Sequence, residues 1–480
     1  MTLTTDRQRV AAHVGGRELA RQRAFRSDAL ETSVLGLLTV TVVLFLLDGG
    51  GPALTVGSAA SRLEALGRVT GLVGTALLLV QLLLAARLPW VDRTYGHDRA
   101  LVAHRRISRV ALPLLLAHAL ALVISYGAQR GLSPALSWLV EPIYLLGGEL
   151  PDMLTAFASL LLLVVVAVTS MNLARRRVRH ETWHVVHLTA YAAVVLSIPH
   201  QLSNGTDIAG HPLQRLWWLS LYVATAGAVV LFRVLLPLVR SLRHALVVEA
   251  VVPEAPGVVS VHVRGRQLDR LPARAGQFLQ WRFLSPGLFA AAHPWSLSAA
   301  PDGRTLRLTV RDLGDHSRRL SRLRPGTRVL IEGPYGRFTT DRRTRRRVLL
   351  VAAGIGITPI RALAEELVSS GTVGPDDVTV LYRANDADSL VLGDELQELA
   401  ATGALQLHLL VGRPVPGSWL PPGLAGRPDG DVATLRRLVP LLRTHDVYLC
   451  GPPAWMALVR GDLRAAGVPR TQIHDERFGW

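Results

Sequence analysis

The chain has 480 residues, 49% of them hydrophobic, and a formal net charge of +17. The sequence contains no lysine, so arginine supplies all of the positive side-chain charge counted here. Its one cysteine, Cys450, excludes an intrachain disulfide framework and an iron–sulfur cluster held only by cysteines of this chain. The arginines gather beside apolar segments, so the basic charge favours a membrane, and not a nucleic acid, as the partner.

The first half of the chain is typical of a membrane domain. Residues 1–31 are polar and rich in arginine, and we expect them to form a cytoplasmic tail. Apolar stretches follow, each close to the roughly 20 residues that a helix needs to cross a bilayer. They are 30–47, 69–86, 107–126, 153–174, 182–203 and 216–239. They predict a six-helix transmembrane domain over residues 32–243.

Arginine marks every second loop between these stretches. The loops 87–106 and 175–181 carry five and four arginines, whereas 48–66, 127–152 and 204–215 carry one each. Loops rich in arginine stay on the cytoplasmic side of a membrane. The pattern predicts a multi-pass protein of the plasma membrane with both termini in the cytoplasm.

The composition changes near residue 244, where short β-like runs separated by Gly and Pro predict a small antiparallel barrel over 244–340. From about residue 341, strands alternate with helices, which predicts a parallel sheet of the nucleotide-binding type over 341–480. The fold class expected is therefore a multi-domain membrane protein: a six-helix bundle, an antiparallel β-barrel and an α/β domain.

Four histidines lie at matched levels of two apolar stretches. His104 and His118 are 14 residues apart, and His187 and His200 are 13 apart, so each pair is separated by roughly 20 Å along a helix. Neutral imidazole is a strong axial ligand of haem iron. The loop topology pairs His104 with His187 and His118 with His200, which predicts two haem centres on separate levels.

The two spacings are not equivalent on a helix. At about 100° per residue, 14 residues return to within roughly 40° of the start, but 13 residues miss by roughly 140°. We expect Pro199 to kink the helix and bring His200 back onto the shared face. His184 is an alternative ligand to His187. In the other interpretation, the histidines only hydrogen-bond within the bundle.

Two motifs in the barrel region suit a flavin. HPWSLSAAP (293–301) provides Trp295 and Ser296 for the ring and His293 for the phosphates. The alternative for Trp295 is a purely structural place in the barrel core. RDLGDHSRRL (311–320) places a small residue and a hydroxyl at a helix start, where phosphate binds readily. The candidate contacts are Gln277, Phe278, His293, Pro294, Trp295, Ser296, Gly314 and Ser317.

A second group of motifs suits a dinucleotide. VLLVAAGIGITPI (348–360) is a buried strand that runs through two glycines into a helix beginning at a proline, which lets the backbone approach a pyrophosphate. YLCGPPAWM (448–456) lies at a strand end on the same edge of the sheet. The candidates are Gly354, Gly356, Thr358, Pro359, Cys450, Gly451 and Pro452. Cys450 is alternatively only a small buried residue.

Arg383 follows the predicted strand Val378–Tyr382, at the place where dinucleotide folds read the adenosine ribose. A guanidinium there can pair with a 2′-phosphate, so the sequence favours NADPH over NADH. The alternative is a solvated surface arginine. At the C-terminus, HDERFGW ends in two aromatics that either cover a flavin ring or dock the tail.

In this order, the histidine pairs, GQF, HPWS, GPYG (333–336), GIGITP, CGP and the terminal ERF resemble the ferric reductase and NADPH oxidase superfamily over about residues 30–480. The resemblance implies two b-type haems on His104, His118, His187 and His200. It also implies FAD on the HPWS motif and the Gly314–Ser317 turn, and NADPH or NADH on the GIGITP and CGP motifs. The wider ferredoxin–NADP reductase class has arginine where this chain has His293. The membrane oxidases have histidine at this position, so His293 favours the resemblance to them.

The resemblance also implies a reaction. Candidate catalytic residues at the nicotinamide and flavin rings are Cys450 and Phe478, with Trp480 competing for the role of Phe478. Electrons would pass from NAD(P)H through FAD and two haems to an acceptor outside: a ferric chelate, dioxygen (giving superoxide) or a periplasmic protein. The alternative is a membrane-anchored NAD(P)H:flavin reductase without haem that serves a separate partner protein.

Overall fold

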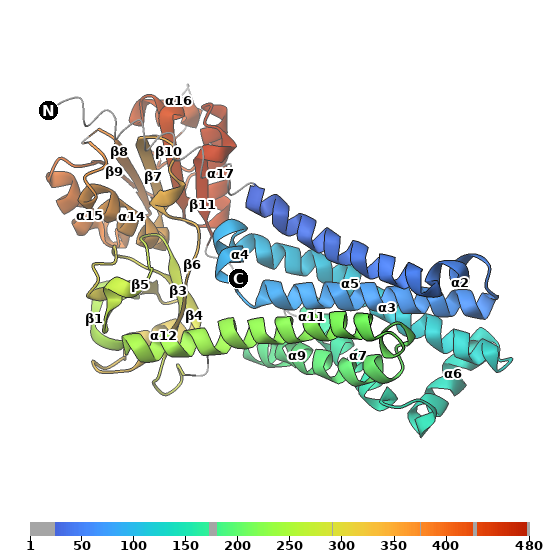
Figure 1. Ribbon diagram of the computed structural model, residues 1–480. Helices are drawn as coiled ribbons and strands as arrows, with labels where there is room; N and C mark the ends of the chain where they lie inside the picture. The colour runs from blue at the N-terminus through green and yellow to red at the C-terminus, as the bar shows by residue number, and fades with distance from the viewer. Residues whose placement is uncertain (1–24, 172–179, 290, 375, 426–429, 478–480) are drawn as a thin grey trace. The chain divides into compact units, whose positions relative to one another are not determined.

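The computed structural model describes residues 25–171, 180–289, 291–374, 376–425 and 430–477. The chain divides into two compact units, one running from Arg26 to Val234 and the other holding the chain from Leu235 onward. The first unit is helical, and the second combines sheets and helices (Figure 1).

Within the described residues, six helices are long and apolar enough to cross a bilayer, which confirms the predicted stretches. They are Phe25–Thr55, α3 (Ala59–Ala85), α5 (His97–Gln129), α7 (Met153–Ser170), α9 (His180–Ser203), and α11 (Pro212–Val230) continued through the π turn η3 (Leu231–Leu235) into α12 (Leu236–His244). Shorter elements connect them: η1 (Leu46–Gly50), α2 (Gly51–Thr55), α4 (Pro89–Thr94), α6 (Pro134–Tyr144), η2 (Leu145–Glu149) and α10 (Thr206–Ala209). Residues 1–24 and the arginines of the 175–179 loop lie outside the described residues.

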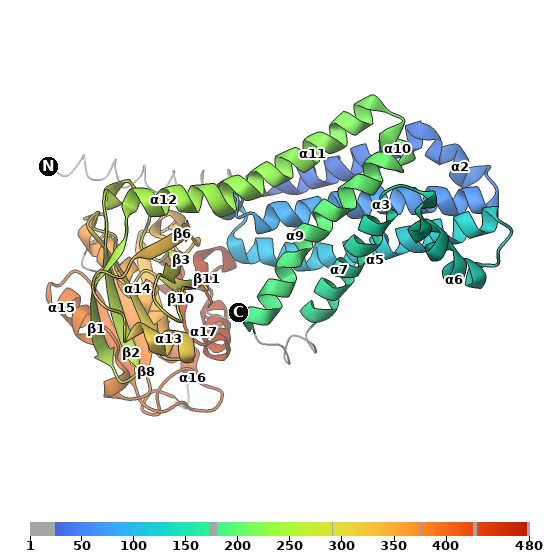
Figure 2. The same ribbon diagram turned by 90° about the horizontal axis from the view of Figure 1, so that it is seen from below.

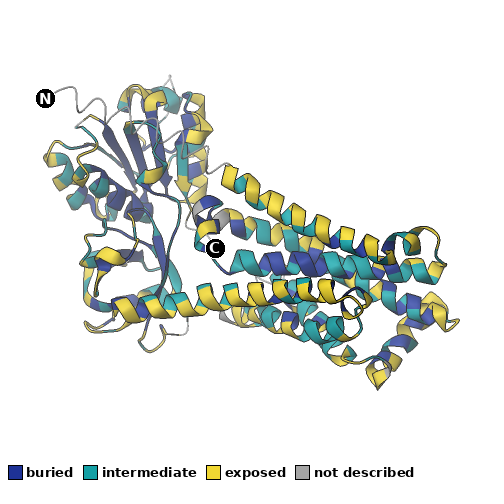
Figure 3. Cartoon of the chain, viewed as in Figure 1, coloured by how far each residue is buried: buried dark blue, intermediate teal, exposed yellow. Residues whose placement is uncertain are grey.

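Helix α3 is the central helix of the first unit. Half of its most apolar window is buried, compared with 11% or 17% in the other five candidate spans, and Figure 3 shows the contrast with the exposed outer helices. Small residues let α5 approach it closely. A Cβ added at Gly67 or Gly74 would lie 2.9 Å from a side-chain carbon of the leucines opposite. Close approach over small residues is a common way for helices to associate in a bilayer.

The second unit begins with two three-stranded antiparallel sheets, ordered β1-β2-β5 and β4-β3-β6. Their strands are β1 (Val247–Ala255), β2 (Val258–Arg264), β3 (Phe278–Phe283), β4 (His293–Ser296), β5 (Thr305–Arg311) and β6 (Val329–Tyr335), with the short helix α13 (Asp315–Leu320) after β5. Isolated bridges join Val247 to Arg328 and Leu297 to Leu308, and so link the two sheets at both edges. The described strands form two linked sheets, and the single closed barrel stays a prediction.

A five-stranded parallel sheet follows, in the order β11-β10-β7-β8-β9. Its strands are β7 (Arg347–Ala353), β8 (Val378–Ala384), β9 (Gln406–Val411), β10 (His445–Cys450) and β11 (Ile473–Glu476); its helices are α14 (Ile357–Ser369), α15 (Gly393–Ala401), α16 (Gly430–Leu438) and α17 (Pro453–Ala465). Strand β8 is buried at every position because α14 and α15 cover one face and α16 and α17 the other.

The strand order of the parallel sheet reverses beside β7. The chain moves outward from β7 to β8 and β9, and then returns to place β10 on the other side of β7. Ligands of open α/β sheets bind outside the carboxyl ends of the strands at such a reversal. The turn after β7 and the residues after β10 therefore meet at one place.

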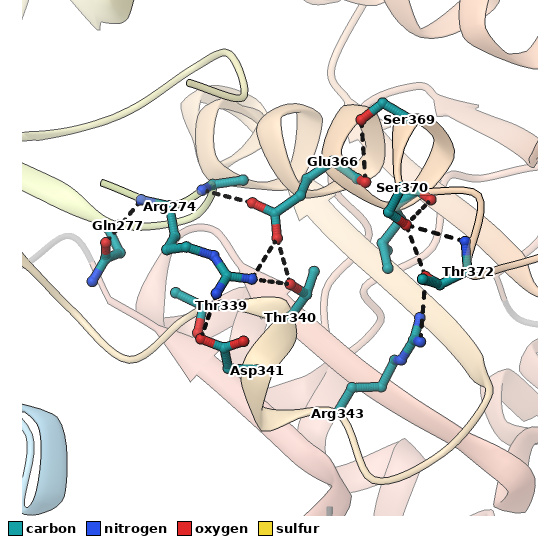
Figure 4. Close-up of polar contacts among 12 residues, drawn as sticks. Arg274, Gln277, Thr339, Thr340, Asp341, Arg343, Glu366, Ser369, Ser370 and Thr372 are labelled. Atoms are coloured by element: carbon teal, nitrogen blue, oxygen red, sulfur yellow. Dashed lines mark hydrogen bonds and ion pairs between the residues drawn. The ribbon is translucent and has the colours of Figure 1, made fainter. Parts of the chain in front are cut away.

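Polar contacts tie the antiparallel sheets to the helices beside the parallel sheet. Arg307 of β5 makes a bidentate ion pair with Glu395 of α15, at 2.6 and 2.9 Å, and Arg361 of α14 lies 2.6 Å from the same carboxylate. A second cluster centres on Glu366 of α14, which accepts hydrogen bonds from the Ala275 main chain at 3.0 Å and from the Arg274 guanidinium at 3.3 Å (Figure 4). These contacts make the two parts one unit.

Three elements of the fold differ from the sequence-based expectation. Helix α6 lies within 127–152, where only a loop with one arginine was expected, and β11 forms a fifth parallel strand at the sheet edge. Strand β8 extends to Ala384, so the prediction that Arg383 follows the strand is wrong. The extension occurs because β9 continues the ladder, pairing Arg383 with Leu410 and Ala384 with Val411.

Candidate functional site

The structure brings the rings of His104 of α5 and His187 of α9 close together, tilted relative to one another. Their ring centres lie 6.2 Å apart with an interplanar angle of 60°. Two imidazoles that bind one metal from opposite sides, through metal–nitrogen bonds of about 2 Å, have ring centres roughly 6 Å apart. The separation therefore leaves room for one metal ion between the two rings.

Both α5 histidines are held by main-chain oxygens of α3. His118 Nδ1 lies 2.9 Å from the Gly67 oxygen, and His104 Nδ1 lies 3.2 Å from the Gln81 oxygen. A carbonyl oxygen only accepts, so Nδ1 carries the proton in both rings and Nε2 keeps its lone pair. A metal-binding histidine usually donates its other ring N–H in this way. The neutral tautomer required of a ligand is therefore imposed by α3.

The two contacts occur in the same register. Helices α3 and α5 run antiparallel, and the two acceptors are 14 residues apart, as are the two histidines. Gly71 makes the His118 contact possible, because a Cβ at this position would lie 2.5 Å from His118 Nδ1. Sequence reasoning missed this role of α3, since main-chain oxygens give no signal in a sequence.

On α9, His187 Nδ1 lies 3.3 Å from the Ser170 hydroxyl, and its ring stacks on Trp183 at 5.0 Å. The ring centre of His184, the alternative ligand, lies 6.5 Å from that of the adjacent Trp183. His200 lies near the other end of α9, one residue after Pro199. Its Nδ1 is buried without a hydrogen-bond partner among the described residues.

This donor set suits haem better than a protein-only metal site. Among the described residues, no group of three or more His, Cys, Asp or Glu side chains could hold a metal ion. A haem iron needs only two axial ligands from the protein, because the macrocycle supplies the other four. The His104–His187 pair and the His118–His200 pair match that requirement.

The predicted flavin motif lies on β4 and around α13. His293 stacks on Trp295 with ring centres 5.4 Å apart, and His316 contacts His293 at 3.7 Å. Trp281 donates a hydrogen bond to the Trp295 main-chain oxygen at 2.9 Å, which fixes β4 against β3. Sequence reasoning missed His316, although it lies inside the predicted phosphate-binding motif two residues after Gly314.

The other flavin candidates make local contacts. The Ser317 hydroxyl accepts hydrogen bonds from the main-chain N–H groups of Leu313 at 2.8 Å and Gly314 at 3.1 Å, and so closes the turn before α13. The Gln277 side chain accepts from Arg274 N at 2.9 Å and donates to the Gly336 oxygen at 3.3 Å. Phe278 packs on Tyr335 with ring centres 5.9 Å apart. Pro294 and Ser296 lie in β4, and Ser296 is buried.

The glycine turn after β7 and the CGP segment after β10 meet at the carboxyl ends of these two strands. A Cβ at Gly356 would lie 2.4 Å from the Cys450 main-chain oxygen and 2.8 Å from Gly451 Cα, so only glycine permits this contact. Gly354 has φ +53°, in the left-handed region that favours glycine. Two motifs that are 94 residues apart in the sequence thus form one edge of a single site.

The buried neighbours of this turn are structural in character. Thr358 donates its hydroxyl to the Ile355 oxygen at 3.1 Å, Pro359 is buried at the start of α14, and Pro452 caps α17. Cys450 is fully buried, and burial, together with the charges of Glu476 and Asp475, raises the pKa of its thiol. Cys450 is therefore held as a neutral thiol.

Two arginines lie near the same edge. The Arg311 guanidinium, at the end of β5, would be 3.9 Å from a Cβ at Gly354. Sequence reasoning missed Arg311, because its approach depends on how the sheets pack. Arg383 is 5% exposed, which overturns the alternative of a solvated arginine. Burial lowers the pKa of Arg383, and the contacts of its guanidinium are the main-chain oxygens of Ala384 and Leu410. Phe478 and Trp480 lie outside the described residues.

Comparisons with known proteins match both units. The family model "Ferric reductase like transmembrane component" matches residues 70–198, and "Oxidoreductase NAD-binding domain" matches residues 350–461. Ferredoxin–NADP reductase B of Sorangium cellulosum is 30% identical over 212 residues, which cover 42% of this chain and 84% of that protein.

Other relatives carry the same kind of module. The ferredoxin reductase component of 3-ketosteroid-9-alpha-monooxygenase from Mycobacterium tuberculosis is 33% identical over 216 residues, which cover 44% of this chain and 56% of that protein. The chain thus spans little more than half the length of this relative. Among solved structures, the FAD/NAD-binding domain of nitric oxide dioxygenase from Vibrio cholerae is 26% identical and covers 49% of this chain and 99% of that chain, with a TM-score of 0.41.

Proposed function

Because the chain belongs to the ferredoxin–NADP reductase family and joins a module of that family to a ferric reductase-like transmembrane component, we propose that it carries electrons from cytoplasmic NAD(P)H across the membrane through two haems. It is an NAD(P)H-dependent oxidoreductase with an FAD-type reductase module. The haems, the direction of transfer and the acceptor belong to the proposal.

The two cofactor types divide the chemistry, since bound flavin accepts a hydride and releases electrons one at a time, as haem iron requires. We assign FAD to the linked sheets of residues 244–340 and the dinucleotide to the carboxyl edge of the parallel sheet in residues 341–480. There, Trp295 and His293 would flank the flavin, and Gly314 and Ser317 would seat its pyrophosphate. Phe478 would cover the flavin ring, with Trp480 as the alternative.

At this edge, Gly354 and Gly356 let the main chain approach the dinucleotide pyrophosphate, and Arg311 supplies a positive charge beside them. Thr358, Pro359, Gly451 and Pro452 hold the two segments together. Cys450 remains a neutral thiol beside the nicotinamide and contributes shape, not charge.

The observation that carries the haem proposal is the geometry of the four histidines. The His104–His187 ring separation of 6.2 Å suits one iron between two nitrogens. The hydrogen bonds from His104 and His118 to α3 leave Nε2 of both rings free to bind it. The second pair lies at another level of the same helices, so electrons have two sites in sequence along the bundle.

The arginine-rich loops support an orientation with the nucleotide site in the cytoplasm and the His118–His200 level toward the outside of the plasma membrane. The acceptor is then an extracytoplasmic oxidant: a ferric chelate, dioxygen (giving superoxide) or a periplasmic protein. NADPH is favoured as donor, because Arg383 is a buried cation at the edge where the ribose is read. Among the described residues, its guanidinium contacts carbonyl oxygens and no carboxylate.

Proteoliposomes test transmembrane transfer. With the reductase unit facing outward, NADPH added outside should reduce a membrane-impermeant ferric chelate trapped inside. His118→Ala should abolish this reaction and leave the reduction of an external dye unchanged. If external dye is reduced while the trapped chelate stays oxidised in the wild type, the proposal fails and the haem-free flavin reductase is supported.

A further inference from the structure

Helix α6 has an inverted pattern of polarity. Its two polar residues, Ser137 and Glu141, are one turn apart and are both 0% exposed. Its large apolar residues point outward, with exposed fractions between 44% and 71%. They are Leu136, Trp138, Leu139, Ile143 and Tyr144. A surface helix in water shows the opposite pattern.

The inward face of α6 packs against the C-terminal end of α5. Ser137 packs against Gly127, where an added Cβ would lie 2.0 Å from the Ser137 hydroxyl, and that hydroxyl donates to the Ser133 oxygen at 2.9 Å. Glu141 makes an ion pair with Arg130 at 3.0 Å, and the Arg130 guanidinium lies 4.8 Å from the centre of the Tyr144 ring. These contacts fix which side of α6 faces outward.

The length and place of α6 limit what can cover that outward side. Its 11 residues span about 16 Å, roughly half of the hydrocarbon core of a bilayer, so it is too short to cross. It connects α5 to α7, two candidate spans whose joined ends must emerge at one membrane face. Both spans also expose apolar side chains, such as Leu120 on α5 and Leu154 and Leu161 on α7.

We propose that α6 is an interfacial helix whose outward face inserts into the lipid acyl chains at this membrane surface. The apolar surface of the neighbouring spans continues onto α6, so the same lipid covers both. Trp138 and Tyr144 have the amphipathic rings that gather at the boundary between acyl chains and headgroups. The two polar residues of α6 face away from this surface: Ser137 donates to the Ser133 oxygen, and Arg130 balances the charge of Glu141. The segment 134–144 is thus a membrane-embedded part of the bundle and not a solvated loop.

The single cysteine makes this proposal testable on the full-length protein in lipid vesicles. Cys450 is fully buried, so a spin label reacts only with an introduced cysteine. Leu139→Cys and Ile143→Cys, at 71% and 69% exposure, report on α6. Leu161→Cys on α7, at 64% exposure, is the control for a side chain in lipid. Glu398→Cys, exposed on α15, is the control for water.

The collision rates of the label with oxygen, which dissolves in lipid, and with a nickel chelate, which stays in water, give the answer. We expect the α6 labels to resemble the Leu161 label, with high oxygen accessibility and a nickel collision rate several-fold below that of the Glu398 label. Nickel accessibility equal to that of the Glu398 label would overturn the proposal in favour of a solvated loop. An immobilised label shielded from both reagents would overturn it in favour of a protein partner or a second copy. Two label positions ensure that one poorly folding variant does not decide the outcome.

Discussion

His118 Nδ1 lies 2.9 Å from the main-chain oxygen of Gly67, and this contact orients an imidazole of α5 from a helix that itself contains no histidine. The contact depends on Gly71, whose missing side chain leaves space for the ring. The equivalent contact between His104 and Gln81 occurs 14 residues away on both helices. Helix α3 therefore positions both α5 rings for the proposed haems.

Gly71→Ala should displace the His118 ring and lower the haem content from two toward one per chain, with FAD content unchanged. Gly227→Ala on α11 is the matched control, because a Cβ there meets nothing within 4 Å. Pyridine haemochrome and flavin assays on both purified variants measure the effect. Equal haem loss in both variants would point to a general intolerance of alanine in the bundle, and full occupancy in Gly71→Ala would show that α3 does not position His118.

Residues 244–480 expressed alone should be soluble, bind FAD and reduce dyes with NAD(P)H. The second unit has its own hydrophobic cores and its own ion pairs between sheets and helices. Flavin fluorescence and a dye assay check the result. A folded fragment that does not retain FAD at high FAD concentration would show that the flavin site needs the membrane unit.

Arg383→Ala should raise the KM for NADPH and leave the KM for NADH nearly unchanged. A charge-assisted hydrogen bond of roughly 1.5–3 kcal/mol corresponds to about a ten- to hundredfold effect. Arg413→Ala is the control, since Arg413 is an exposed arginine just after β9. Equal changes for both nucleotides, or a wild-type preference for NADH, would refute the assignment of the 2′-phosphate to Arg383.

The ion pair between Arg307 and Glu395 should make the stability of the second unit depend on pH. Burial alone would raise the pKa of Glu395, but the hydrogen bond from Arg307 and the charge of Arg361 hold this pKa below its usual value of 4.5. A carboxylate with a lowered pKa stabilises the folded state above its unfolded pKa, and this stabilisation is lost as the pH falls through the folded pKa.

We therefore expect the unfolding free energy of the 244–480 fragment to decrease below pH 4.5, with a shallower decrease in Glu395→Gln. Denaturant titrations at several pH values measure both slopes. Parallel curves for the two proteins would show that Glu395 does not contribute to the acid dependence.

The sequence predicts the parts of this molecule that have a local period or a local motif. Six apolar stretches and the alternation of strands and helices are visible in the order of residues, and so are four histidines at matched levels. Helix α6 was not predicted, because it is too short to cross a membrane. Its polar residues, Ser137 and Glu141, also face inward, which is the reverse of the pattern that marks a surface helix. The roles of Gly71 and Arg311 depend on what packs against them, which one sequence cannot show. Arg383 was placed after β8 because the continued pairing with β9 has no local signal.

The central claim is that two pairs of histidines hold two haems in the membrane unit. The most direct test is the absorption spectrum of the purified full-length protein before and after NADPH addition without oxygen, combined with haem and FAD quantification. We predict a Soret band, a sharp α-band that develops on NADPH addition, and two haems per FAD. The two-haem value should fall in His104→Ala and in His200→Ala. A spectrum with flavin bands alone would contradict the account, and one haem per FAD in the wild type would show that only one histidine pair binds iron.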